Sequence, residues 1–132
     1  MAGYSGTPLP KKLGIKNQFR IELVAMPAEL RAELKDSLAS CRTAKDNLDF
    51  AMIFVKKQAE LRKEFSRISR QLAPAGMLWV SWPKQSSGVP TDLNENIVRE
   101  IGLTLGLVDV KVCAVNDVWS GLKFVIRLKD RK

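Results

Sequence analysis

The chain has 132 residues, of which 45% are hydrophobic and 27% are charged, and its formal net charge is +8. This length and composition are typical of one globular domain that buries its own core without disulfides or a structural metal. The sequence contains no histidine and two isolated cysteines, which excludes Ser-His and Cys-His nucleophile pairs and the usual zinc patterns. We therefore expect no metal and no cofactor, and we expect Cys41 and Cys113 to be reduced structural thiols.

No apolar run approaches the roughly 20 residues that a membrane-spanning helix needs. The first residues also lack the apolar segment of a signal peptide. We therefore expect a cytoplasmic protein that makes no membrane contact.

The first half of the chain predicts an arm, two strands and the helix between them. Residues 1–18 mix glycine, serine, proline and lysine, which favours an N-terminal arm with one helical turn over residues 10–15. Residues 19–25 alternate as a strand does. Pro27 suits the first turn of a helix that continues to about Ala39, because leucines recur every four residues along it. Residues 48–55 are almost continuously apolar, which is typical of a strand buried on both faces.

The second half predicts two helices and three strands. An amphipathic helix follows the apolar strand and ends at residues 73–76, and residues 77–82 form the next strand. Asp92 and Glu95 have the spacing of a capping box, and the helix that they begin ends at Gly106. Residues 107–115 and 122–128 alternate, and the segment between them is too short for a crossover helix, so they form an antiparallel hairpin. The order of elements predicts one α/β domain over residues 19–132, a three-layer α/β/α sandwich around a five-stranded, mainly parallel sheet.

One stretch of the sequence resembles a known fold. Residues 46–84, DNLDFAMIFVKKQAELRKEFSRISRQLAPAGMLWVSWPK, resemble the Asp-containing fourth strand, the next helix and the L-x-P-x-G-x-L-x-V fifth strand of class I methyltransferases. The terminal hairpin resembles their reversed seventh strand. At closer range, YSGTPLPKKLGIK, WPKQSSGVPTDLNENIVRE and GLVDVKVCAVNDVWSGLKFV resemble a family of short bacterial proteins of unknown function that has a reduced, Rossmann-like form of this fold.

The resemblance implies an order of strands in the sheet. The order is 19–25, 48–55, 77–82, 122–128, 107–115, with residues 122–128 antiparallel to the rest. Residues 19–25 then form an edge strand, because the strands that would cover them in a full methyltransferase have no sequence here.

The chain departs from the methyltransferase pattern where the cofactor would bind. In that fold a glycine-rich turn after the first strand admits S-adenosylmethionine, and an acidic residue that ends the second strand holds the ribose. Here Met26 and Pro27 replace the glycine turn, and residues 39–48 are too few for two further strands and a helix. Asp49 is interpreted as a structural residue at the start of a strand. We therefore predict a degenerate S-adenosylmethionine site.

Open α/β sheets bind ligands at the carboxyl ends of their strands. At this edge the sequence predicts an anion site beside the N-terminus of the helix that follows Asp92, where N–H groups and the helix dipole favour negative charge. The residues of this site are Lys56, Lys57, Lys84, Ser86 and Thr91, and Trp82 is predicted to line a pocket. The alternative is that Thr91 and Asp92 only cap the helix and that the lysines are solvated.

Three functions follow, and the first is preferred. The chain is a noncatalytic binding or interaction protein that takes a protein or a small anionic ligand. One alternative is a nucleic-acid-binding accessory protein with weak, nonspecific affinity, because lysines and arginines cluster near both termini and over residues 56–70. The other is an enzyme that uses Lys56, Lys84 and Asp92 on a small anionic substrate. The protein is either a monomer or a dimer paired through the edge strand 107–115.

Overall fold

The computed structural model describes residues 7–131. Its strands are β1 (Arg20–Val24), β2 (Arg42–Thr43), β3 (Leu48–Phe54), β4 (Leu72–Pro83), β5 (Leu107–Ala114) and β6 (Trp119–Ile126). Its helices are α1 (Leu9–Leu13), α2 (Ala28–Glu33), α3 (Lys35–Ala39), α4 (Gln58–Ser69) and α5 (Glu95–Thr104), with 3₁₀ turns η1 (Gln85–Ser87) and η2 (Leu128–Asp130). Within these residues, no helix has the length and apolar character needed to cross a membrane.

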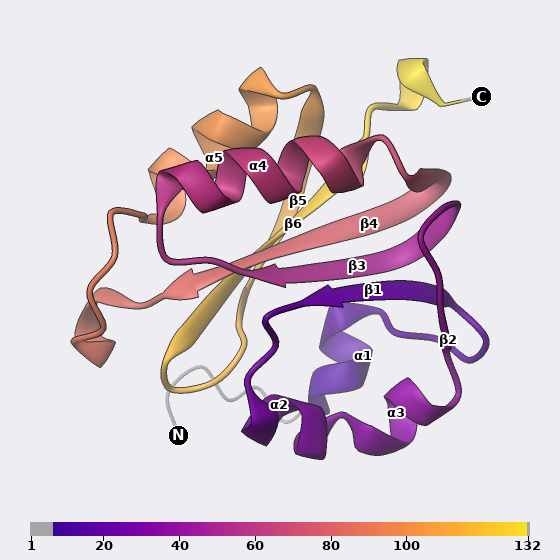
Figure 1. Ribbon diagram of the computed structural model, residues 1–132, viewed down its shortest axis with the longest axis horizontal. Helices are drawn as coiled ribbons and strands as arrows, with labels where there is room; N and C mark the ends of the chain where they lie inside the picture. Colours follow the sequence, from indigo (N-terminus) through magenta and orange to yellow (C-terminus); the bar gives the residue numbers. More distant parts are fainter. Residues whose placement is uncertain (1–6, 132) are drawn as a thin grey trace.

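All six strands form one sheet in the order β2-β1-β3-β4-β6-β5. The first four are parallel, and β6 runs antiparallel to both β4 and β5. Helices α4 and α5 cover one face, and α1, α2 and α3 lie on the other (Figure 1). The predicted three-layer α/β/α sandwich with a C-terminal antiparallel hairpin is therefore confirmed, and the five predicted strands have the predicted relative order, but the sheet has a sixth strand, β2, that the sequence did not predict.

Each face of the sheet has its own apolar core. Under α4 and α5, Leu61, Phe65 and Ile101 pack on side chains from β3, β4 and β6. On the other face, the leucines of α1 and α2 pack around Trp79, which is fully buried and donates a hydrogen bond from Nε1 to the Leu13 carbonyl oxygen at 2.9 Å. Six of the seven residues of β3 are buried because β3 lies between two strands and two helical layers.

The prediction that the first strand forms an edge of the sheet is wrong, because β2 pairs with it. The Arg42 N–H donates to the Phe19 carbonyl oxygen at 2.8 Å, and the Ala44 N–H donates to that of Ile21 at 3.0 Å. β2 has only two residues and pairs with Arg20 and Ile21 alone. A strand of this length has no alternation for a sequence pattern to detect, and its pairing depends on backbone contacts with β1.

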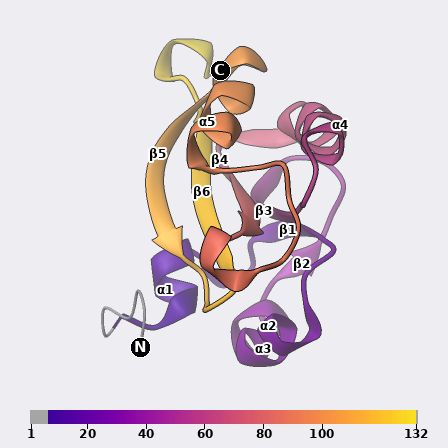
Figure 2. The same ribbon diagram turned by 90° about the vertical axis from the view of Figure 1, so that its left-hand side faces the viewer.

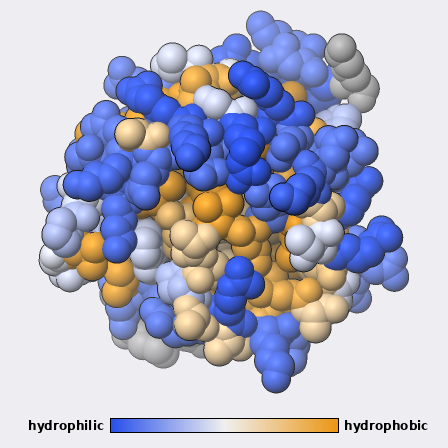
Figure 3. Space-filling view, viewed as in Figure 1, coloured by the Kyte–Doolittle hydropathy of each residue, from blue (hydrophilic) through white to orange (hydrophobic). Residues whose placement is uncertain are grey.

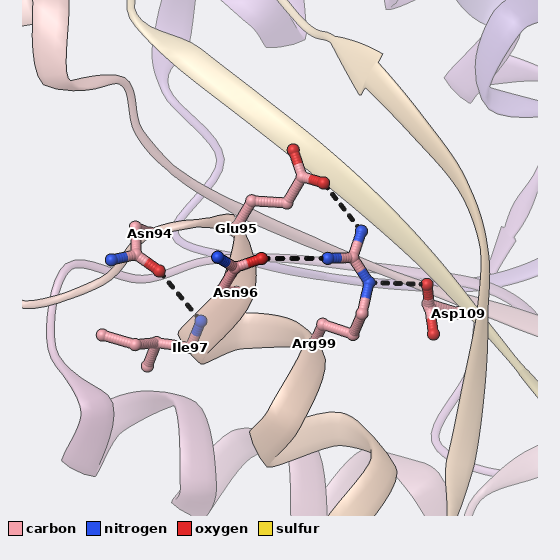
Figure 4. A network of polar contacts seen from close by, with 6 residues as sticks. All are labelled: Asn94, Glu95, Asn96, Ile97, Arg99 and Asp109. Atoms are coloured by element: carbon pink, nitrogen blue, oxygen red, sulfur yellow. Dashed lines mark hydrogen bonds and ion pairs between the residues drawn. The ribbon is translucent and has the colours of Figure 1, made fainter.

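Two helix predictions also change. The helix predicted from Pro27 to about Ala39 is divided into α2 and α3 at Leu34, whose φ and ψ are −94° and 5°. Helix α5 is capped by Asn94 and not by Asp92: the Ile97 N–H donates to Asn94 Oδ1 at 2.9 Å (Figure 4). Both residues are good N-caps, and the choice depends on contacts that Asp92 makes with another helix.

Strand β5 forms the outer edge of the hairpin and contains a bulge. Asp109 pairs with Phe124 and Lys111 with Lys123, so Val110 is an extra residue. Arg99 fixes this part of the edge to α5, because its guanidinium bonds Asp109 at 2.8 Å and Glu95 at 2.7 Å (Figure 4). These two carboxylates raise the pKa of Arg99.

Candidate functional site at the carboxyl edge of the sheet

The N–H groups of the two residues just before α4 and of its first residue bind carboxylates of the chain. Glu60 Oε1 accepts hydrogen bonds from the N–H groups of Lys56 at 3.0 Å and Lys57 at 3.1 Å. Asp92 Oδ1 accepts from the Gln58 N–H at 2.8 Å. A helix N-terminus is a natural anion site, and here two side-chain carboxylates occupy it. The N–H groups of Lys56, Lys57 and Gln58 are therefore taken by carboxylates of the chain, and the exposed Lys56 and Lys57 ammonium groups offer further donors for an external anion.

Hydrogen bonds join the loop before α5 to the start of α4. The Thr91 hydroxyl donates to the Lys56 carbonyl oxygen at 2.6 Å and accepts from the Leu93 N–H at 3.1 Å. Gln58 Nε2 donates to the Asp92 carbonyl oxygen at 3.0 Å. The structure thus brings Thr91 to Lys56, as the sequence predicts, but the contact is structural and runs through the backbone of Lys56.

The other predicted site residues lie in different surroundings. Lys56, Lys57 and Ser86 are exposed. Lys84 is half-buried, and its N–H donates to the Val118 carbonyl oxygen at 2.8 Å, which ties the end of β4 to the turn of the hairpin. Trp82 is only 4% exposed and belongs to the core under α4 and α5. Among the contacts found within residues 7–131, none joins Lys84 to Lys56.

The carboxyl end of β1 has an unusual turn. Ala25 has a φ of +58°, in the left-handed region that glycine adopts without strain. The turn therefore has a conformation typical of glycine although the sequence has no glycine here. Met26, the next residue, is 7% exposed and packs into the core around Trp79.

No acidic residue stands at the end of β2 where the methyltransferase pattern would place one beside this turn. Thr43 pairs with Ile21, three residues before the end of β1, and the chain then turns back to start β3 at Leu48. Asp46 in this turn is exposed and lies near enough to Arg20 to raise its pKa slightly, after the larger effect of Asp49. It is therefore at the amino end of the sheet.

Asp49 has the structural role that the sequence predicts. Its Oδ2 accepts from the Arg20 N–H at 2.8 Å and from Arg20 Nε at 3.2 Å. Burial alone would raise the pKa of Asp49, but the hydrogen bonds and the charge of Arg20 outweigh it and lower that pKa. This pair joins β1 to β3 near the amino ends of these strands, away from the carboxyl edge of the sheet.

One further hollow lies away from this edge of the sheet. A groove between α4 and α5 has a volume of about 170 Å³ and is lined by Gln58, Arg62, Ile97, Glu100, Ile101 and Thr104. It is smaller than the roughly 300 Å³ at which small-molecule pockets begin. Within residues 7–131 no group of acidic or cysteine side chains could hold a metal ion. Sequence reasoning missed Gln58 and Glu60, and only the position of Glu60 in the first turn of a helix could have indicated its capping role.

No protein-family model matches the chain, and no curated protein matches its sequence. Solved structures do match its fold. An S-adenosylmethionine-dependent methyltransferase from Aquifex aeolicus has a TM-score of 0.63 and 17% identity, with 86% of this chain and 85% of that chain covered. A methyltransferase from Pyrococcus furiosus has a TM-score of 0.56 and 11% identity, with 88% and 78% covered.

A third structure is fibrillarin from Aeropyrum pernix, solved with natively bound S-adenosylmethionine. Its TM-score is 0.57 and its identity 11%, with 89% of this chain and 73% of that chain covered. Identities this low are evidence of shared fold and not of shared chemistry. The chain therefore has the Rossmann-like fold of class I methyltransferases, with a second strand of two residues.

Proposed function

We propose that the chain is a noncatalytic binding protein that keeps the methyltransferase fold without its cofactor pocket. We also propose that it belongs with the short bacterial proteins that its sequence resembles. The observation that carries the first proposal is the length and register of β2. Its two residues pair with the amino half of β1, so no residue from β2 is available at the carboxyl end of β1 to hold a ribose.

The turn after β1 supports the same conclusion. A cofactor that lies against a backbone turn needs a close approach, which glycines permit because they have no Cβ. Here Ala25, Met26 and Pro27 form the turn, and Met26 fills the space beneath it. The left-handed conformation of Ala25 retains the shape of the turn but adds a methyl group to it.

The positive side chains at this edge provide the binding function. Lys56 and Lys57 are exposed beside α4, and Lys84 lies at the end of β4. Because the N–H groups of Lys56, Lys57 and Gln58 are bonded to Glu60 and Asp92, the lysine side chains would hold a small anionic ligand or an acidic side chain of a partner protein. Their task is binding, since the sequence has no histidine to serve as the usual general base near neutral pH.

Thermal unfolding with and without S-adenosylmethionine tests this proposal. A ligand that binds only the native state raises Tm, and at about 100 times its Kd it adds roughly 2.7 kcal/mol to stability. We expect no shift with S-adenosylmethionine or S-adenosylhomocysteine and no methyl transfer from labelled cofactor. A saturable rise in Tm that disappears in an Ala25→Arg variant would show that the pocket exists and would overturn the proposal.

A further inference from the structure

Two lysines lie side by side on the face of the sheet that α1 covers. Lys111 of β5 and Lys123 of β6 are direct cross-strand neighbours. Across β4 and β6, Lys123 lies opposite Trp79, whose side chain belongs to the core around α1. The residues on either side of Lys123 in β6, Leu122 and Phe124, belong to the opposite core. The side chains of both lysines are therefore directed to the α1 face.

Helix α1 brings a third lysine to this pair. Lys111 Nζ donates to the Lys12 carbonyl oxygen at 3.0 Å, and Lys12 Nζ lies 3.5 Å from the Ala114 carbonyl oxygen. Figure 2 shows α1 next to β5 and β6, as these contacts require. A lysine ammonium has three N–H donors, so the contact with Lys12 leaves two donors of Lys111 for another acceptor.

The chain does not neutralise the Lys111–Lys123 pair. Like charges directly opposite each other on neighbouring strands destabilise a sheet. Burial, and then the charge of Lys111, lower the pKa of the half-buried Lys123. Neither lysine belongs to an ion pair within residues 7–131, whereas Arg67 on the other face is paired with both Glu22 and Glu64.

We propose that Lys111 and Lys123, beside helix α1, form a binding site for a phosphoryl group. A dianion beside two ammonium groups offsets their repulsion and compensates for the partial desolvation of Lys123. Tetrahedral phosphoryl oxygens can accept from several ammonium groups at once, and lysine is a common phosphate ligand. This site is on the α1 face and does not depend on whether a cofactor pocket exists at the end of β1.

Calorimetric titration with pyrophosphate tests the site. The variants are Lys111→Met and Lys123→Met, and the control is Lys63→Met, which removes the same charge from an exposed position on α4 across the sheet. Each lysine donates a charge-assisted hydrogen bond, so we expect pyrophosphate to bind about tenfold more weakly for each site lysine removed, which is roughly 1.4 kcal/mol each. We expect Lys63→Met to bind as the unaltered chain does.

A second readout separates binding from a structural role. Because Lys123 is partly desolvated beside a like charge, Lys123→Met is expected to raise the urea midpoint of unfolding while it weakens pyrophosphate binding. A variant that simply failed to fold would lower both. The absence of pyrophosphate binding to the unaltered chain, or an equal loss in Lys63→Met, would overturn the proposal, because the effect would then belong to the net charge.

The source of the phosphoryl group is settled by a second probe. A single-stranded DNA oligonucleotide, followed by fluorescence anisotropy at low salt, either binds more tightly than pyrophosphate or does not. Tighter binding that is lost in Lys123→Met assigns the site to a polynucleotide backbone, for which affinity also falls steeply with salt. Weaker binding of the oligonucleotide than of pyrophosphate assigns the site to a small phosphate compound. Oligonucleotide binding that survives in Lys123→Met, together with unchanged pyrophosphate affinity, contradicts the site.

Discussion

At the scale of single residues, Ala25 has a backbone conformation that its side chain disfavours. Its φ of +58° places it in the left-handed region, which costs a residue with a Cβ about 1–2 kcal/mol. Glycine would remove this cost but would also make the unfolded chain more flexible, by roughly 0.4–1 kcal/mol. The two effects oppose each other, and the conformational cost is the larger.

We therefore expect Ala25→Gly to raise the free energy of unfolding by up to about 1 kcal/mol. The matched control is Ala59→Gly, an exposed position inside α4, which should lower stability by about 1 kcal/mol because glycine disfavours helices. Urea unfolding of both variants measures the difference. A loss in Ala25→Gly as large as that in Ala59→Gly would contradict the strained turn.

Gly102 is the second residue with a specific packing role. A Cβ at this position would lie 2.1 Å from the ring of Phe124, so α5 approaches β6 more closely than any side chain allows. Gly102→Ala is expected to destabilise the protein by about 1–3 kcal/mol through overpacking, although alanine favours helices. Exposed Thr104 on the same helix is the control, and Thr104→Ala should be nearly neutral.

A double variant checks the cause. If the clash with the ring lowers stability, Phe124→Leu should cost less in the Gly102→Ala background than in the unaltered chain. Additive losses would instead indicate that alanine acts on α5 alone.

At the scale of elements, the Arg20–Asp49 pair joins β1 to β3 and makes their contact sensitive to acid. The pKa of Asp49 is lowered in the folded state, and its usual value is about 3.9. The pair therefore contributes stability above that value, and this contribution is lost as the pH falls through the lower, folded-state pKa.

Asp49→Asn is expected to lower stability at pH 7, and the difference from the unaltered chain should shrink as the pH falls below about 4. Urea unfolding over a series of pH values measures this. Asp117→Asn, at an exposed position in the hairpin turn, should show little difference at any pH. If the difference in free energy of unfolding between Asp49→Asn and the unaltered chain stayed constant into strong acid, the carboxylate charge would not be its cause.

The elements differ in how far the sequence could predict them. β3 was predicted because six of its seven residues are apolar, and the hairpin was predicted because its residues alternate. The cap of α5 was missed because Asp92 and Asn94 are both good caps, and the Gln58 N–H, 34 residues away, bonds Asp92. The division at Leu34 was missed because leucines at 30, 34 and 38 fit one helix as well as two.

The candidate site could also be predicted only in part from the sequence. Thr91 was correctly placed near Lys56, because parallel strands end at the same edge of a sheet. The sequence could not show that Glu60 and Asp92 bond the first N–H groups of α4, since Asp92 reaches that helix only through the fold. Trp82 was predicted at a pocket and is buried in the core instead, because α4 and α5 cover the end of β4.

At the scale of the whole molecule, the bulge in β5 bears on self-association. Two of the large apolar side chains most exposed to solvent, Val110 and Val112, lie on this edge strand at 54% and 48% exposure. A regular edge of this kind invites pairing with a second copy, and a bulge disrupts such pairing. We therefore favour the monomer over the edge-paired dimer.

Sedimentation analysis measures this directly. The unaltered chain is expected to remain monomeric at tens of micromolar, the range in which exposed edges cause association. Deletion of Val110 restores a regular ladder from Asp109 to Lys111 and should increase self-association. The control Val110→Thr keeps the bulge and should stay monomeric. A dimer that forms equally with and without Val110 would show that the bulge has no such role.

The shortness of β2 also determines which backbone amides of β1 are protected from hydrogen exchange. β2 ends beside Ile21, so the outward backbone N–H of Leu23 has no strand partner within residues 7–131. The face of the molecule drawn in Figure 3 has an apolar area between α4 and the α2–α3 pair. The N–H groups of Glu22 and Val24 face β3 and are paired in the ladder. In deuterated water the amide of Leu23 should therefore exchange much faster than those of its two neighbours, because exchange follows local opening of backbone hydrogen bonds. A single strand would then have a protected side and an unprotected side, and ligand or partner binding at this edge would be visible as slower exchange at Leu23 alone.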